Sequence, residues 1–269
     1  MREALNTGNA PYAVITGASG GLGKSFATAC AARGYNLLMV DVAGSEVKKC
    51  CEFLQKNFDT TSLYMEADIT TNSSAEDLLA FIRQHNIQVG LLINNAGIPQ
   101  NEFFASTQPE LLRNMVNVNC LGTINITKAL LPELRKQPRS HIISVSSLGS
   151  FYTLPRKTCY SATKGFIRQF CQALAMEEAG NGVRVSVLCP GPMTTNIDNY
   201  LLHRQLNWFS KKMVQKPENV SRYTLQQALK GREIIIPGRM NRILKTLSSL
   251  MPAFLKRKLS AYSMKQLGK

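Results

Sequence analysis

Histidine and acidic residues are scarce in this chain, and their scarcity excludes some functions. The 269 residues include three histidines and 17 acidic residues, against 32 lysines and arginines. His85, His141 and His203 form no ligand spacing with Cys, Asp or Glu, so we expect no metal site. The seven cysteines are scattered, without the spacing of a disulfide framework. An odd number of such cysteines indicates reduced thiols in a cytoplasmic protein.

Long apolar runs, internal repeats and linkers are also missing. No apolar stretch approaches the roughly 18 residues of a membrane span, and Met1–Pro11 is polar, so we expect neither a transmembrane helix nor a signal peptide. The length suits one domain with a large core. We assign residues 10–237 to this domain and residues 238–269 to a C-terminal extension.

Strand-like and helix-like segments alternate along the chain, which predicts an α/β fold with a parallel sheet covered on both faces. Apolar runs predict strands at 12–16, 36–40, 62–66, 90–94, 141–146, 183–189 and 233–236. Helical patterns fall between them, near 22–33, 45–57, 72–84, 109–131 and 160–178.

The first predicted strand runs directly into a glycine-rich turn, and a helix that ends at Gly34 follows. The free amides and the positive dipole end of a helix N-terminus attract a phosphate, and glycines let the backbone approach it closely. A tight turn alone would also explain the glycines, but the strand before and the helix after favour an anion site. The residues predicted to bind a dinucleotide here are Gly17, Ser19, Gly21, Leu22 and Gly23.

Asp41 ends the second predicted strand, 24 residues after Gly17. In a dinucleotide fold a carboxylate at this place accepts hydrogen bonds from the adenosine ribose, and it would repel a 2′-phosphate. No arginine follows Asp41 to bind the extra phosphate of NADP. Lys24 is a nearby cation that favours binding of this phosphate. The alternative for Asp41 is a solvent-facing side chain at a strand end. The pattern favours NAD as cofactor over NADP.

Tyr160 and Lys164 lie four residues apart at the start of a predicted helix. That spacing places both side chains on one face, one turn apart. Because a nearby ammonium group favours the phenolate, we expect Lys164 to lower the pKa of Tyr160 from about 10 toward neutrality. Tyr160 is the candidate that exchanges an alcohol proton during hydride transfer. An ordinary helix surface is the alternative for an isolated pair of this kind.

Several motifs, taken in order, resemble the short-chain dehydrogenase/reductase family. They are Thr16-Gly17-x-x-x-Gly21-x-Gly23, Asn94-Asn95-Ala96-Gly97, Asn119, Ser147, Tyr160-x-x-x-Lys164 and Pro190-Gly191. The resemblance covers roughly residues 10–195. It implies a doubly wound, Rossmann-like sheet of seven parallel strands in a single domain. It also implies an NAD(P)-dependent enzyme that acts on CH–OH groups, and a homo-oligomer.

The resemblance also assigns roles in catalysis. Ser147, thirteen residues before Tyr160, would hydrogen-bond the substrate oxygen, with the neighbouring Ser146 as the competing assignment. Lys164 would also bond the nicotinamide ribose. Asn119 would support a water-linked proton relay behind the lysine.

Further cofactor contacts follow from the same resemblance. Asp68 and Ile69 resemble the pair that brackets the adenine. Asn95 follows the fourth strand, where a polar side chain is either structural or in contact with the cofactor. Pro190 ends the sixth strand, at the edge where ligands bind in such sheets. Thr195 matches the family's hydroxyl near the nicotinamide amide, with Thr194 as the alternative.

Positive charge is concentrated at the end of the chain. Residues 201–269 carry 15 lysines and arginines against two acids, and apolar residues from Met240 onward recur at helical spacing. Pro252 would start a second helix in this segment. The segment either covers the domain with its charges in solvent or lies on an anionic membrane; we narrowly favour the first interpretation. Nucleic-acid binding is disfavoured because a recognisable binding motif is missing.

Residues 196–219 are predicted to form a substrate lid. They mix apolar side chains with cations, which suits a lipophilic substrate that carries an acid group, such as a steroid acid or a fatty acyl derivative. A surface loop with its own small core is the alternative.

The function predicted from all these features is hydride transfer between NAD(H) and a secondary alcohol or ketone, with a hydroxysteroid or a fatty acyl derivative as substrate. An NADPH-dependent 3-oxoacyl or carbonyl reductase is the alternative within the same chemistry. The alternative from another class is an NAD-sensing protein that binds a membrane or a nucleic acid through its basic tail.

Overall fold

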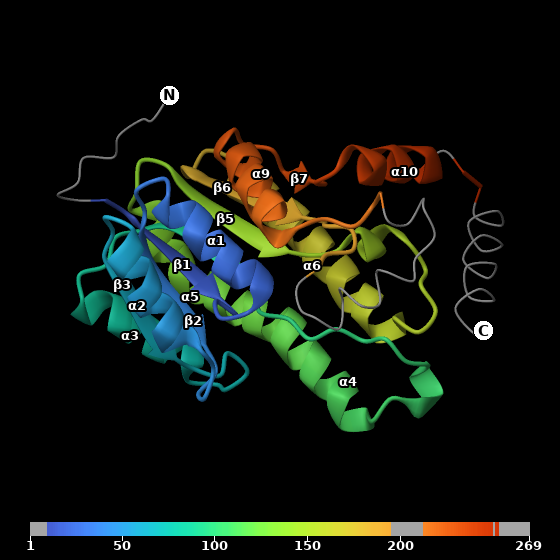
Figure 1. Cartoon of the computed structure of the whole chain (residues 1–269), viewed down its shortest axis with the longest axis horizontal. Coiled ribbons are helices and arrows are strands. Elements are labelled where there is room, and N and C mark those ends of the chain that lie inside the picture. Colours follow the sequence, from blue (N-terminus) through green and yellow to red (C-terminus); the bar gives the residue numbers. More distant parts are fainter. Residues whose placement is uncertain (1–9, 195–211, 250, 253–269) are drawn as a thin grey trace.

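A parallel sheet of seven strands forms the centre of the structure (Figure 1). The computed structural model describes residues 10–194, 212–249 and 251–252. The strands lie in the order β3-β2-β1-β4-β5-β6-β7, and every neighbouring pair is parallel. Their bounds are β1 Tyr12–Thr16, β2 Asn36–Asp41, β3 Ser62–Glu66, β4 Val89–Asn94, β5 Ser140–Val145, β6 Val183–Leu188 and β7 Ile234–Ile235. Each predicted strand is confirmed to within one residue.

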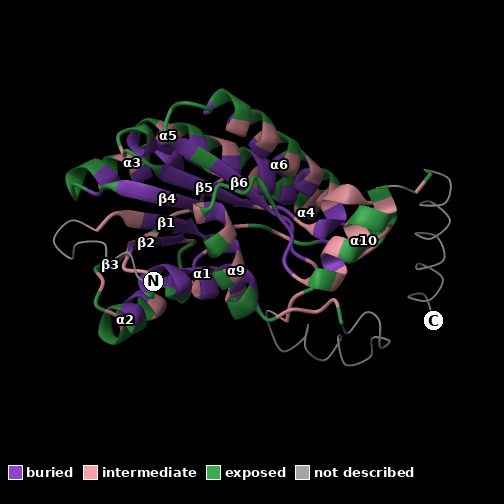
Figure 2. Ribbon diagram, turned by 90° about the horizontal axis from the view of Figure 1, so that it is seen from above, coloured by how far each residue is buried: buried purple, intermediate pink, exposed green. Residues whose placement is uncertain are grey.

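Helices cover both faces of this sheet, as Figure 2 shows. Residues of one parity along the strands, such as Ile15 and Met39, pack against α1, α2 and α9. Residues of the other parity, such as Val14 and Leu38, pack against α3, α5 and α6. Because successive strand side chains point to opposite faces, the continuous apolar runs of β1 and β2 supply both cores. The helices are α1 Gly21–Ala31, α2 Val47–Asn57, α3 Ser74–Gln84, α4 Pro109–Val116, α5 Thr123–Arg135, α6 Thr158–Glu177, α9 Pro217–Leu229 and α10 Arg239–Ser249.

The expectation of one continuous helix over 109–131 is wrong. The chain forms α4, then a π-helical segment at Asn117–Gly122, then α5, which ends at Arg135. The widened turn contains Asn119, whose amide is bonded to both backbone groups of Ile98. This contact with a residue far away in the chain explains why the helix departs from α geometry here, since π-segments accommodate such local demands.

The strand order reverses between β1 and β4, because the chain runs from β1 outward to β3 and then returns to the other side of β1. In open α/β sheets this switch point, at the carboxyl ends of the strands, is where ligands bind. The glycine turn after β1 and Asn94–Gly97 after β4 meet at this place.

Two predicted segments lie largely outside the described residues. Of the predicted lid, only residues 212–219 are described, and the last three of them already belong to α9. Of the helix predicted to start at Pro252, only Pro252 itself is among the described residues. Within the described ranges, no helix is long and apolar enough to cross a membrane.

The helix α10 has two different sides. Leu244 packs against the core, and Asn241 is buried. Lys245 lies over the Phe151 ring at 5.7 Å from its centroid. On the outer side, Ile243 and Leu247 are 52% and 59% exposed. The predicted apolar stripe is therefore divided, with one part covering the domain and the other facing solvent.

Candidate functional site

The glycine turn after β1 is built for close backbone packing. Gly17 has φ +62, and a Cβ added to it would lie 2.8 Å from the Cα of Ala96. A Cβ on Gly23 would lie 2.1 Å from the Gly17 carbonyl oxygen. No side chain caps the N-terminus of α1, and its first turn contains no acidic residue. The positive end of the helix therefore remains available to an anion.

Asn95 holds this turn in place. Its side-chain nitrogen donates to the carbonyl oxygens of Thr16 and Gly17, at 3.2 and 2.8 Å. The hydroxyl of Thr16 accepts in return from the backbone amides of Asn95 and Ala96. Both hydrogens of the Asn95 amide group are therefore used within the protein. Of the two roles that the sequence left open for Asn95, the structural one has direct contacts.

Asp41 lies at the end of β2, beside the turn. Its Oδ2 accepts from the backbone amide of Ser19 at 2.8 Å and from the Ser19 hydroxyl at 2.6 Å. Its Oδ1 accepts from the backbone amide of Val42 at 2.9 Å. These bonds orient the carboxylate against the glycine turn, so two residues predicted to bind the cofactor lie together.

Asp68 and Ile69 face different surroundings. The Asp68 carboxylate accepts from the backbone amide and the hydroxyl of Thr70, at 2.9 and 2.8 Å. Ile69 is buried, and its Cδ1 lies 2.8 Å from where a Cβ on Gly122 would be. Ile69 thus packs on the π-helical segment, while Asp68 is exposed.

Tyr160 and Ser147 are brought together at the start of α6. The Ser147 hydroxyl is near enough to the Tyr160 phenol to lower its pKa. Ser147 Oγ also accepts from the backbone amide of Gly149 at 3.0 Å. The competing Ser146 is buried and donates to the carbonyl oxygen of Lys164 at 2.6 Å. This geometry favours Ser147 over Ser146 as the hydroxyl that works with Tyr160.

Lys164 is buried directly behind Tyr160. Its Nζ donates to the Val145 carbonyl oxygen at 2.8 Å and lies 5.9 Å from the centroid of the Tyr160 ring. Burial lowers the pKa of Lys164 to about 8. A Cβ on Gly97 would lie 3.1 Å from both this Nζ and the Oδ1 of Asn119. Lys164 and Asn119 therefore flank Gly97, and a side chain at this position would press against both of them.

The expected lowering of the Tyr160 pKa is wrong for this structure. Burial raises the pKa of Tyr160, and the neighbouring Ser147 hydroxyl lowers it by a smaller amount. Desolvation penalises the charged phenolate, and the Lys164 ammonium, 5.9 Å from the ring centroid, does not offset this penalty. The phenol consequently holds its proton through neutral pH.

Asn119 connects the loop after β4 with α6. Its Oδ1 accepts from the Ile98 amide at 2.8 Å, and its Nδ2 donates to the Ile98 carbonyl oxygen and to the Thr163 hydroxyl. The Thr163 hydroxyl donates in turn to the Tyr160 carbonyl oxygen at 2.8 Å. Asn119 thus fixes the distance between the Gly97 loop and the tyrosine.

Gln100 is a site residue that sequence reasoning missed. Its buried Oε1 accepts from the backbone amides of Cys159 and Tyr160, at 3.0 and 3.3 Å. Its Nε2 donates to the Thr107 hydroxyl at 3.1 Å. Gln100 therefore satisfies the free amides at the start of α6 in place of a local cap. No sequence signal could have identified it, because the contact spans 59 residues of chain.

Pro190 lies two residues after the end of β6, and its carbonyl oxygen accepts from the Leu148 amide at 2.8 Å. A Cβ on the adjacent Gly191 would lie 2.5 Å from the Asn241 side chain, so α10 closes tightly over this turn. Thr195 lies outside the described residues.

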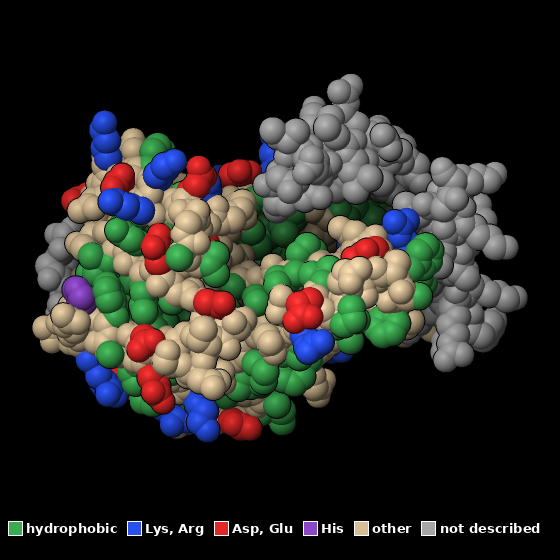
Figure 3. All heavy atoms as spheres, turned by 90° about the horizontal axis from the view of Figure 1, so that it is seen from below, with side chains coloured by type: hydrophobic (Ala, Val, Ile, Leu, Met, Phe, Trp, Pro, Cys, Tyr) green, Lys and Arg blue, Asp and Glu red, His purple; other side chains and the backbone are tan. Residues whose placement is uncertain are grey.

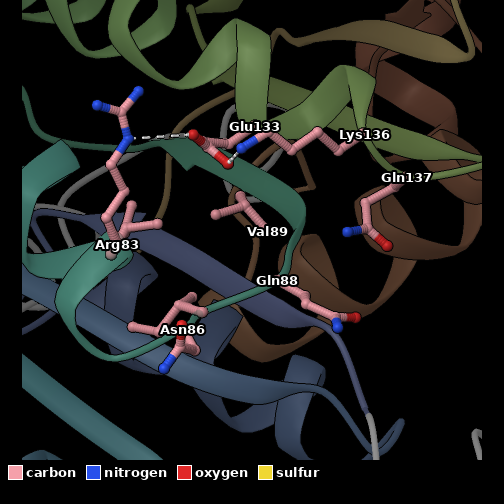
Figure 4. A pocket seen from close by; sticks show the side chains of 9 residues that line it. Arg83, Asn86, Gln88, Val89, Glu133, Lys136 and Gln137 are labelled. Carbon is pink, nitrogen blue, oxygen red and sulfur yellow. Dashed lines mark hydrogen bonds and ion pairs between the residues drawn. The ribbon is translucent and has the colours of Figure 1, made fainter.

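A separate pocket of about 340 Å³ lies at the amino end of β4, opposite the predicted site. Figure 4 shows Arg83 and Lys136 on either side of Glu133, with amide side chains around them. None of the predicted site residues that the structure describes lines this pocket. Its cations are paired with Glu133, so it offers no acid–base group comparable to Tyr160.

A model of the short chain dehydrogenase family matches residues 11–205. The chain belongs to this family. It is therefore an oxidoreductase that acts on alcohol and ketone groups, with a fold that binds NAD(P). The very-long-chain 3-oxoacyl-CoA reductase of Phaeosphaeria nodorum is 31% identical over 68% of this chain and 55% of that protein, so the chain matches about half of that relative. An uncharacterized oxidoreductase of Staphylococcus epidermidis is 32% identical over 69% of this chain and 81% of that protein.

Solved structures share the same fold. A 7beta-hydroxysteroid dehydrogenase has a TM-score of 0.81 at 22% identity and covers 94% of this chain and 96% of its own. A short-chain dehydrogenase from Sphingobium yanoikuyae in complex with NADPH has a TM-score of 0.76 at 22% identity, over 90% and 96%. A 3-oxoacyl-[acyl-carrier protein] reductase from Brucella melitensis with bound NAD has a TM-score of 0.73 at 24% identity, over 86% and 92%. The cofactors named for these structures include both NAD and NADPH.

Proposed function

We propose that the protein transfers hydride between NAD(H) and a secondary alcohol or ketone on a lipophilic substrate. The observation that carries this proposal is the grouping of Ser147, Tyr160 and the buried Lys164, whose Nζ lies 5.9 Å from the centroid of the Tyr160 ring. This group of side chains lies at the carboxyl edge of the sheet, as does the glycine turn that suits a dinucleotide.

The chain's own residues supply the proton chemistry. Tyr160 donates its phenolic proton to the ketone oxygen in reduction and takes the proton back in oxidation. Ser147 lies near Tyr160 and would donate to the same substrate oxygen. Lys164 stabilises the phenolate that Tyr160 becomes after donating its proton. Asn119 holds the Gly97 loop against α6 through its bonds to Ile98 and Thr163. The nicotinamide cofactor, when bound, supplies or accepts the hydride.

The cofactor would be held by the glycine turn and the strand ends around it. The close packing at Gly17 and Gly23 lets a pyrophosphate approach the start of α1. Asp41 supports NAD over NADP, because its carboxylate would bond the ribose hydroxyls and repel a 2′-phosphate. Asp68, Ile69, Asn95, Pro190 and Thr195 stay proposals for the remaining contacts.

Exposed aromatic rings and a cation support a lipophilic substrate with an acid group. Phe103 and Phe104 are 52% and 60% exposed in the loop that follows Gln100. Lys157 lies 5.5 Å from the centroid of the Tyr160 ring, and the described residues supply it with no ion pair. The names of the fungal reductase and of the steroid dehydrogenase structure agree with an acyl or steroid substrate.

The test is to titrate the purified protein with NADH and NADPH and to screen ketones and secondary alcohols with each cofactor. Hydroxysteroids and 3-oxoacyl thioesters belong in the screen, each with a neutral and an acidic member. We expect turnover with NAD(H). Turnover only with NADPH would favour the 3-oxoacyl or carbonyl reductase alternative. Tight NAD binding without turnover of any alcohol or ketone would favour the NAD-sensing alternative.

We also propose a homo-oligomer in the cytoplasm. Val116, Leu121 and Phe166 are exposed apolar side chains on α4, the π-helical segment and α6. Hydrophobic side chains also gather on the face of the molecule that Figure 3 shows. All seven cysteines are free thiols, which supports a reducing compartment. Light scattering of the purified protein tests the assembly, and a monomeric mass at micromolar concentration would contradict it.

Peripheral membrane contact is a weaker proposal for the C-terminal segment. The exposed Ile243 and Leu247 of α10 support it, because they lie one helical turn apart on the outer side. The cations Arg242 and Lys245 of the same helix instead face Tyr223 and Phe151 of the domain.

A further inference from the structure

Lys24 forms an ion pair at the start of α1. Its Nζ donates to Glu46 Oε2 at 2.9 Å, while Lys49 Nζ lies 4.0 Å from the other oxygen of the same carboxylate. Glu46 directly precedes α2, and both partners of the Lys24–Glu46 pair are partly in solvent, with side chains 42% and 61% exposed. In the sequence analysis, Lys24 was the nearby cation that favoured binding of the 2′-phosphate of NADP(H).

This ion pair joins the two segments that meet at Asp41. Lys24 lies in the first turn of α1, five residues after Ser19, whose backbone amide and hydroxyl donate to the Asp41 carboxylate. Glu46 lies five residues after Asp41, at the end of the connection between β2 and α2. The Lys24–Glu46 pair therefore connects the helix that follows the glycine turn to the segment that follows the carboxylate which, in the proposed function, bonds the adenosine ribose.

We propose that Glu46 is a further determinant of cofactor choice, because it keeps Lys24 paired and so withholds that cation from the 2′-phosphate of NADP(H). This inference rests on the proposed function, in which Asp41 selects NAD(H). A 2′-phosphate brings nearly two negative charges to the ribose, and its binding depends on a neighbouring cation to compensate them. When Lys24 is bonded to Glu46, its charge no longer compensates the 2′-phosphate, and the Asp41 carboxylate repels that phosphate. NAD(H) has no 2′-phosphate, so its affinity should not depend on the Lys24–Glu46 pair.

The experiment measures dissociation constants for NADH and NADPH by fluorescence titration of the full chain at low salt. The variants are Glu46→Gln, Lys24→Met and the double variant. Glu46→Gln should tighten NADPH about fivefold, the upper range for an exposed charge pair, because Lys24 becomes free to turn to the phosphate. The gain should shrink as salt is added. In the double variant it should disappear, because the released cation is then missing.

Glu52→Gln is the matched control. Glu52 is exposed on the same helix α2, and its removal changes the net charge equally without touching Lys24. It should leave the affinity for NADPH unchanged. An equal gain in Glu52→Gln would mean that overall charge explains the effect, and would overturn the inference.

Two further results would also overturn it. One is an NADPH affinity that Glu46→Gln does not change. The other is a gain that persists in full in the double variant, because Glu46 would then act by its own repulsion and not through Lys24. The proposed function is judged separately, by the wild-type protein: equal or tighter binding of NADPH than of NADH there would contradict the role of Asp41, whatever Glu46 does.

Discussion

The phenolic oxygen of Tyr160 can be removed with little change in packing, so Tyr160→Phe isolates the chemical step. The ring stays in place, and the folded state loses at most one hydrogen bond of the phenol, such as one to the neighbouring Ser147. Such a bond contributes about 1 kcal/mol, which is small beside a domain stability of about 5–15 kcal/mol. The variant should therefore remain folded and keep its affinity for NADH.

Turnover should fall by a factor of about 10² to 10⁴, the contribution of a positioned general acid–base. This range corresponds to a rise of roughly 3–5 kcal/mol in the activation barrier. The loss should appear in kcat, because the phenolic proton moves in the chemical step and not on binding. The assay is steady-state turnover of the best ketone from the screen, with NADH affinity measured by fluorescence on the same sample.

Tyr12→Phe is the matched control. Tyr12 lies at the amino end of β1, away from the catalytic residues, and its hydroxyl is near Thr61. This variant should lose a comparable amount of stability and keep its turnover. Near-normal turnover in Tyr160→Phe would remove Tyr160 from the mechanism, and an equal loss of turnover in Tyr12→Phe would show that the assay reports stability.

Three other predictions concern the cofactor, the buried lysine and α10. NADH should bind at least about tenfold more tightly than NADPH, and Asp41→Ala should shrink that ratio in a fluorescence titration; an unchanged ratio would contradict the role of Asp41. Because the folded pKa of Lys164 is about 8 and the ordinary value is 10.5, the unfolded chain binds more protons at this group between those pH values, so Lys164 should add up to roughly 3 kcal/mol of stability as the pH rises across this window. Buried thiols with raised pKa values, such as Cys30 and Cys171, act in the opposite direction, so the test compares urea unfolding of the wild type and of Lys164→Met. The difference between their free energies of unfolding should shift in favour of the wild type between about pH 7 and pH 10; an unchanged difference would contradict this role of Lys164. If α10 contacts membranes, the protein should sediment with vesicles rich in anionic lipid at low salt, and an Ile243→Ser/Leu247→Ser variant should not. Wild-type protein that stays in solution would contradict membrane contact and would show that α10 only covers the domain.

Features that depend on neighbours along the chain could be predicted from the amino-acid order alone. The apolar runs predicted each strand, since a strand buried on both faces must be apolar throughout. The glycine turn between β1 and α1 and the four-residue spacing of Tyr160 and Lys164 are likewise local patterns. They were sufficient for the family and the fold, because a strand, a tight turn and a helix can be read within about 20 residues.

How distant segments meet at the site became visible in the folded chain and not in its sequence. Gln100 satisfies the start of α6 across 59 residues, and Asn119 widens its own helix through its bonds to Ile98. The pKa of Tyr160 depended on burial, which no spacing of residues contains. In α10, the helical spacing predicted a stripe of apolar residues. It did not show which residues of this stripe face the domain and which face solvent. The physical reason is the same in each case: desolvation and long-range hydrogen bonds are set by what packs against a residue, and the chain places those partners far from it in sequence.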